Sequence, residues 1–164
     1  MCCRYDKILF LIWYDDEELA IYFSEIPDIR NKEIHKQYMS KEQIMYAKQK
    51  PLYCKNKLIV ILKDKIKNKI YKFEIPENYD YDGASIPRFC WRIVGSKENI
   101  EFKIASLIHD YLCENHQVID FDRYFSSKVL ERLLYVGDCS NFRRWLMFHC
   151  VDNYQKFCAW KKVV

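Results

Sequence analysis

The sequence predicts an α+β fold, in which a small antiparallel sheet in the N-terminal half packs against three helices in the C-terminal half. Strand-like segments rich in β-branched and aromatic residues end at Pro76. All but one of the segments with a helical spacing of apolar residues follow Asn99. The 164 residues are a typical length for one domain (1–164), and 50% apolar residues are enough for a sizeable core.

Four strands are predicted before the helices. Residues 7–14 and 19–24 are aromatic and β-branched, with the acidic stretch 15–18 as the turn between them. Residues 57–64 (KLIVILKD) and 69–76 (KIYKFEIP) flank the short stretch KIKN, which predicts a hairpin. These strands are expected to form an antiparallel sheet.

A short helix is predicted over 41–49, with Ser40 as its N-cap. Longer helices are expected over about 99–114 and 120–136, and the second of these ends at Gly137, a natural C′ residue. A third helix starts from Ser140. Its predicted inner stripe consists of Phe142, Trp145, Leu146, His149 and Phe157.

The composition excludes few classes of function. The formal net charge of +4 is mildly basic, and the lysines between residues 55 and 72 alternate with apolar residues, which favours a solvated sheet face over a nucleic-acid site. Eight cysteines lack the paired CxxC spacing of zinc sites, so we expect free thiols in a reducing compartment, the cytoplasm. The apolar run ILFLIWY (8–14) is too short to span a bilayer.

The stretch YDGASIPR (81–88) contains the glycine and proline residues that are typical of a structured loop. Gly83 is one of only three glycines, and Asp-Gly favours a turn with positive φ. Pro87 fixes the exit, and Arg88 and Trp91 are expected to project nearby. Taken alone, this stretch is a turn in which Asp82 accepts hydrogen bonds from backbone amides.

Several motifs occur together in a fixed order. FEIPENYDYDGASIPRFCWRIVGS (73–96), IASLIHDYL (104–112) and FDRYF (121–125) resemble the DGAS-x-P-R-x-x-W, HD-x-L-Y and D-x-x-F motifs of an uncharacterised family of small phage and prophage proteins. The resemblance covers about residues 51–160. It makes 51–164 the family-like core and 1–50 an N-terminal extension. Cys113 and Tyr81 stand where that family has Tyr and Thr.

His109 and Asp110 are adjacent, so on a helix they point about 100° apart. Asp122 lies on the next predicted helix, from which it could reach His109 and fix its tautomer. This arrangement is also similar to phospholipases A2. That likeness implies His109 as the base that activates water, Asp110 as a calcium ligand and Asp122 as the residue that orients His109.

Two functions remain open. The first is a small hydrolase acting on an ester or phosphodiester, with a divalent cation at Asp110 and with catalytic residues His109 and Asp122. Its predicted substrate-binding residues are Asp82, Ser85, Arg88, Trp91 and Tyr111. The alternative is a non-enzymatic accessory protein that binds a host or virion protein, in which the His, Asp and Arg residues form a purely structural cluster. Nucleic acid is the weakest partner, because a charge of +4 provides little attraction.

Overall fold

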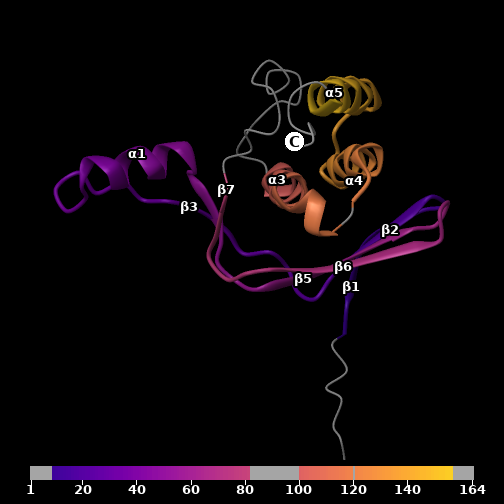
Figure 1. Cartoon of the computed structure of the whole chain (residues 1–164), viewed down its shortest axis with the longest axis horizontal. Coiled ribbons are helices and arrows are strands. Elements are labelled where there is room, and N and C mark those ends of the chain that lie inside the picture. The colour runs from indigo at the N-terminus through magenta and orange to yellow at the C-terminus, as the bar shows by residue number, and fades with distance from the viewer. Residues whose placement is uncertain (1–8, 82–99, 120, 157–164) are drawn as a thin grey trace, which may run out of the picture.

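The computed structural model describes residues 9–81, 100–119 and 121–156 of the chain. The elements within these residues are β1 (Leu11–Asp15), β2 (Leu19–Phe23), β3 (Ile29–Asn31), α1 (Lys41–Gln49), β4 (Leu52–Cys54), β5 (Leu58–Asp64), β6 (Lys69–Ile75), β7 (Tyr79–Tyr81), α3 (Ile100–Ile119), α4 (Arg123–Val136) and α5 (Asn141–Tyr154). All the strands precede α3, α4 and α5, so the predicted α+β fold is confirmed (Figure 1).

The larger sheet has four antiparallel strands in the order β1-β2-β5-β6. The predicted hairpin is confirmed, because Leu58 pairs with Ile75 and Asp64 with Lys69. Asn68 closes its turn with a φ of 51°, a conformation that asparagine tolerates better than most residues. The two N-terminal strands predicted to lie in an extension are part of this same sheet, since β2 lies between β1 and β5.

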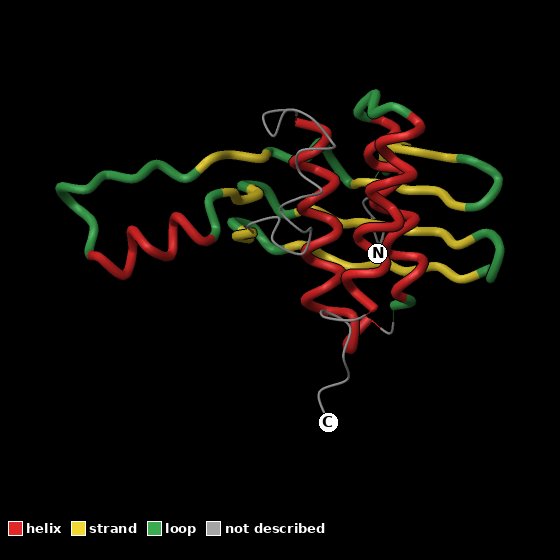
Figure 2. Tube along the Cα trace, turned by 90° about the horizontal axis from the view of Figure 1, so that it is seen from above, coloured by secondary structure: helices red, strands yellow, loops and turns green. Residues whose placement is uncertain are grey.

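The smaller sheet has three antiparallel strands in the order β3-β4-β7, and α1 lies between β3 and β4 in the chain. The predicted cap of α1 is confirmed. The Ser40 side chain accepts a hydrogen bond from the Gln43 backbone N–H, and the Gln43 side chain accepts one from the Ser40 backbone N–H. Figure 2 shows that α1 and its connections project away from the rest of the molecule.

Three helices lie on one face of the larger sheet in two layers. α3 and α4 pack next to the sheet, and α5 packs on α4 on the side away from it (Figure 1). The core lies between the sheet and the first helical layer. Its largest fully buried side chains are Leu19, Ile21, Phe23, Leu58, Leu62, Ile75, Tyr81, Leu107, Ile108, Leu112 and Leu130.

An ion-pair network fixes α4 to the turn between β1 and β2. Arg132 donates to Asp16 at 2.9 Å and to Glu18 at 3.1 Å. Asp16 also accepts hydrogen bonds from the backbone N–H groups of Glu18 and Leu19. The acidic stretch between β1 and β2 is therefore a hydrogen-bonded turn that forms ion pairs with α4, rather than a loop exposed to solvent.

Helix boundaries differ from the predicted ones at two places. α3 continues to Ile119, and α4 begins only at Arg123, with Asp122 as its N-cap. Gly137 follows α4 with a φ of −82°, whereas Asp138 adopts the left-handed conformation with a φ of 58°. Gly137 is still suited to its place, because a Cβ there would lie 2.9 Å from the Cβ of Glu101 on α3.

Candidate functional site

His109 and Asp110 lie in the middle of α3, and both are buried, with exposed fractions of 1% and 2%. As predicted, they point in different directions. His109 contacts a residue beyond the end of α5. The charge of Asp110 instead acts on the hydroxyl groups of Tyr79 and Tyr81 in β7. The adjacent pair therefore reaches two different parts of the fold.

His109 belongs to a polar cluster that joins three helical segments. The Nε2 atom of Gln155 lies 2.6 Å from the Nε2 atom of His109. The Oε1 atom of the same amide accepts hydrogen bonds from Ser126 at 3.4 Å and Ser127 at 3.3 Å, both on α4. Cys113 lies one turn after His109 on α3. We call His109, Cys113, Ser126, Ser127 and Gln155 the His109 cluster.

The hydrogen bonds determine the protonation of the imidazole. An amide nitrogen donates, so the Nε2 atom of His109 accepts, and the proton of the neutral ring lies on Nδ1. Burial lowers the pKa of His109 to about 4. The imidazole is therefore neutral at pH 7, and its Nε2 lone pair is occupied by Gln155.

Cys113 completes the cluster on the side of α3. Its Sγ atom lies 3.8 Å from both ring nitrogens of His109 and accepts a hydrogen bond of 2.9 Å from the Nε2 atom of Gln155. Cys113 is one of four free thiols in the described parts of the chain. These distances place a thiol, rather than a carboxylate, beside the imidazole.

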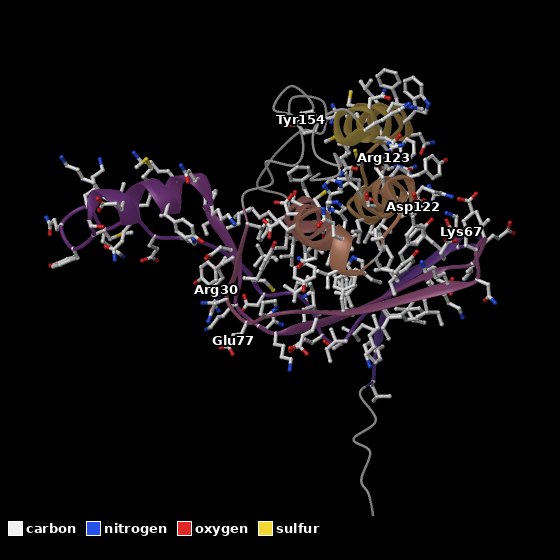
Figure 3. All side chains as sticks on the ribbon, viewed as in Figure 1. Arg30, Lys67, Glu77, Asp122, Arg123 and Tyr154 are labelled. Atoms are coloured by element: carbon white, nitrogen blue, oxygen red, sulfur yellow. The ribbon has the colours of Figure 1, made fainter. Side chains whose placement is uncertain are left out.

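Asp122 does not orient His109. Its carboxylate lies 3.4 Å from the Nζ atom of Lys67, in the turn between β5 and β6, and it is 40% exposed (Figure 3). The prediction failed because α4 begins one residue after Asp122. The carboxylate therefore lies at the exposed end of the helix, not on its apolar side. Gln155 occupies the orienting position expected of Asp122.

Tyr111, predicted to bind substrate, attaches α3 to the larger sheet. Its hydroxyl donates to the backbone oxygen of Glu74 at 2.8 Å, and its ring stacks on Phe73 at 5.3 Å. Asp82, Ser85, Arg88 and Trp91 lie outside the described residues. Their predicted grouping with Asp110 therefore stays a prediction.

The surroundings of Asp110 are rich in tyrosine. The Tyr81 hydroxyl donates to the backbone oxygen of Lys103 at 2.8 Å, and the Tyr79 hydroxyl donates to Glu114. Burial raises the pKa of both phenols well above the ordinary range; for Tyr79 the hydrogen bond to Glu114 and its charge add to this more than Asp110 does, and for Tyr81 Asp110 is the next cause after burial. No group of three or more His, Cys, Asp or Glu side chains in the described residues could hold a metal ion.

Most of the described residues that the sequence predicts on the inner side of α5 are exposed; Leu146 is half-buried, and Phe157 lies outside the described residues. Only Met147 and Val151 are buried along this helix, whereas Phe142 is 68% and Trp145 56% exposed. His149, also predicted to be inside, is exposed and packs edge-on against Trp145. A helix that contacts one neighbouring helix needs only a narrow buried stripe, so most of its aromatic residues face outward.

A cleft opens between α4 and α5 beside these aromatic residues, with a volume of about 470 Å³. Trp145, His149 and Phe148 of α5 line it together with Tyr124 of α4. Phe148 and Tyr124 pack edge-to-face, with ring centroids 5.5 Å apart. The cleft is also lined by charged residues of the β1–β2 turn, α4 and α5, namely Glu18, Lys128, Glu131, Arg132 and Arg144. Its walls are therefore both aromatic and charged.

The fold and site define an α+β protein in which three helices cover one face of an antiparallel sheet and enclose a neutral, buried histidine. A family model described as Protein of unknown function (DUF1353) matches residues 60–151, which is more than half of the chain. The chain belongs to this DUF1353 family. The matched residues contain most of β5, all of β6, β7, α3 and α4, and most of α5, but neither α1 nor Gln155.

One relative is the Uncharacterized protein y4jT of Sinorhizobium fredii (strain NBRC 101917 / NGR234). It is 44% identical over 43 residues, which make up 26% of this chain and 13% of the length of that protein. No solved structure matches the chain. None of the helices that the structure describes is long and apolar enough to cross a membrane.

Proposed function

We propose that the protein is an accessory protein of a phage or prophage that acts by binding a host or virion protein through α5. The observation that carries this proposal is the contrast between the two sides of that helix. Its inner side buries two apolar residues, and its outer side exposes an aromatic surface beside a cleft. The resemblance of the DGAS and HD motifs to phage and prophage proteins supports the choice of partner.

Polar contacts help to hold α5 in place. Arg123 of α4 pairs with Asp152 at 2.5 Å and also donates to the Asp152 backbone oxygen at 2.9 Å. The Ser127 hydroxyl lies 3.1 Å from the Asp152 carboxylate and shares its one proton between Asp152 and Gln155, and Gln155 donates to His109. The His109 cluster is in this account a structural device that fixes the end of α5, and thereby its outer surface.

The chemistry of that surface suits protein recognition. Trp, Tyr and Arg are the residues that most often dominate binding energy at interfaces. The surface contains Trp145 and Phe142 of α5 and Tyr124 of α4, which is 50% exposed. We expect the partner to present an apolar side chain to the cleft and polar groups to its rim.

Replacing Phe142 and Trp145 together with alanine should abolish capture of the partner from an extract of the native host, with little change in melting temperature. If both aromatic residues are hot spots of the interface, truncating each costs about 2 kcal/mol or more, which together is about a thousandfold in affinity. A matched control is Ile12→Ala with Ile70→Ala, because both isoleucines are exposed on the larger sheet. The proposal fails if the control loses the partner equally, or if the α5 variant still captures it.

A small hydrolase is the second candidate, favoured by the adjacency of buried His109 and Asp110 on α3. His109 would be the base, and Asp110 would hold a divalent cation, with Asp82, Ser85, Arg88 and Trp91 as predicted substrate residues. Asp122 has no role in this candidate, because its partner is Lys67. A metal-dependent ester or phosphodiester activity that disappears in His109→Gln, with the fold intact, would favour it over the binding function.

A further inference from the structure

Arg132 lines the cleft between α4 and α5, and all three nitrogen atoms of its guanidinium group donate within the chain. Its Nε atom donates to Asp16 at 2.9 Å, and its Nη2 atom donates to Glu18 at 3.1 Å. Its Nη1 atom donates to Glu131. Lys128, one turn earlier on α4, also pairs with Glu18. Carboxylates of the chain itself therefore hold both cations.

Arg144 of α5 is satisfied in the same way. Its Nη1 atom donates to Glu131 at 2.6 Å, its Nε atom donates to the backbone oxygen of Cys139 at 3.1 Å, and its Nη2 atom donates to Asn141. The two oxygens of Glu131 are thus occupied by Arg132 and Arg144, and none of these three side chains is more than 22% exposed. A guanidinium group whose nitrogens all donate within the chain has no free edge for a carboxylate or a phosphate.

The charges along the cleft balance one another. Three cations and three carboxylates form one set of ion pairs with a formal charge of zero: Lys128, Arg132, Arg144, Asp16, Glu18 and Glu131. A charged group brought into the cleft would either break one of these pairs or lose its water without gaining a partner, and both cost free energy. The charged part of the lining therefore selects against a charged occupant.

The remaining walls of the cleft are a row of rings. Tyr124 packs edge-to-face on Phe148 with centroids 5.5 Å apart, and Phe148 packs on His149 at 5.3 Å with the planes at 90°. His149 packs edge-on against Trp145 at 4.7 Å. Tyr124 and Trp145, at the two ends of the row, are exposed. Edge-to-face contacts are favourable beyond the area that they bury, so a further ring can extend such a row.

We propose that the cleft binds an uncharged aromatic side chain of the partner protein and excludes acidic and basic side chains. The inference rests on the proposed binding through α5, and it adds the chemistry of the group that the partner presents. Aromatic rings are the part of the lining that is open to contact, whereas the charged groups are occupied by one another. Binding in the cleft should therefore depend little on salt.

The test is an NMR titration of the full chain with the N-acetyl amide of tyrosine. It is followed at the indole N–H signal of Trp145, which is assigned by its absence in Trp145→Phe. We expect a saturable shift with a dissociation constant of about 1–10 mM. Tyr124→Leu should weaken binding about fivefold, because one ring of the row is lost. The matched control is Tyr38→Leu, which changes an exposed tyrosine between β3 and α1 and should bind like wild type.

Charge selectivity is measured with the N-acetyl amides of glutamate and lysine. Wild type should bind each at least about tenfold more weakly than the tyrosine amide. Glu131→Gln releases a nitrogen of both Arg132 and Arg144, so this variant should bind the glutamate amide at least about fivefold more tightly than wild type. Glu74→Gln is the matched control, because Glu74 pairs with Lys57 on the larger sheet. Circular dichroism checks that every variant folds.

Four results would each overturn the proposal: no saturable shift with the tyrosine amide, equal binding of the three amides, equal binding by Tyr124→Leu and Tyr38→Leu, or no gain of glutamate binding in Glu131→Gln. The titration needs no partner, so it is separate from the test of α5. If the tyrosine amide fails to bind but the Phe142 and Trp145 variant still loses the partner, this inference fails and binding through α5 stands. If the tyrosine amide binds but that variant keeps the partner, the proposed function fails instead.

Discussion

Replacing His109 with alanine is expected to lower the free energy of unfolding by about 3 kcal/mol. The substitution leaves a cavity between α3 and the end of α5. It also removes the acceptor of the Gln155 amide, a buried group whose other contacts are Ser126, Ser127 and Cys113. A buried donor without its acceptor costs about 1–3 kcal/mol by itself. In a domain of this size the loss corresponds to a fall in melting temperature of about 10 °C.

Thermal or urea denaturation of His109→Ala, Gln155→Ala and the double variant measures this effect. We expect the two substitutions to be coupled by about 1–2 kcal/mol, because they remove the two ends of one hydrogen bond. His35→Ala is the matched control, since His35 is an exposed histidine between β3 and α1, and it should change stability by less than about 0.5 kcal/mol. Additive losses, or a stable His109→Ala protein, would mean that the cluster does not hold α5.

Stability should also fall on mild acidification because of His109. In the unfolded chain its pKa is the ordinary 6.5, and burial in the fold lowers it to about 4. Between these values the unfolded chain binds a proton that the folded chain excludes, so acid favours unfolding. The contribution is fully present above pH 6.5 and is lost as the pH falls toward 4. It amounts to about 3 kcal/mol.

Urea denaturation of wild type and His109→Gln across this pH window isolates the effect. Glutamine does not titrate, so the stability of the variant should change less with pH than that of wild type. The free energy of unfolding of wild type, minus that of the variant, should increase steadily as the pH rises from about 4 to about 6.5. Parallel curves for the two proteins would show that His109 is not the group responsible.

The fold could be predicted where local pattern and tertiary structure agree. The alternation in β5 and β6 and the Asn68 turn lie within one hairpin, and Ser40 with Gln43 lies within one helical turn. These signals need no information from distant residues. The apolar stripe of α3 could also be predicted from local pattern. A helix that is covered on several sides has a wide buried face.

The histidine cluster could be predicted only in part. The position of His109 inside an apolar helix indicated a buried polar contact, but its partner lies 46 residues away and just beyond α5. Asp122 was a plausible partner only if α4 began before it. A helix boundary off by a few residues was therefore enough to choose the wrong side chain.

The predicted inner side of α5 was wrong for a different reason. Phe142, Trp145 and His149 have helical spacing, which indicates one face but not whether that face is inside. The buried residues Met147 and Val151 form a second stripe, four residues apart, on the side that meets α4. When aromatic residues lie on the exposed side of a helix, their spacing predicts burial of the wrong side.

The most direct test of the account is NMR titration of the imidazole nitrogens of His109 in the folded protein. The account predicts that His109 stays neutral from about pH 5 to about pH 8, with its proton on Nδ1 and its Nε2 atom accepting from Gln155. Gln155→Ala should change the Nε2 signal without exposing the ring to water. A histidine that titrates near its ordinary pKa of 6.5 and exchanges protons freely with solvent would contradict the account. It would identify His109 as an accessible base, and the hydrolase candidate would then take precedence.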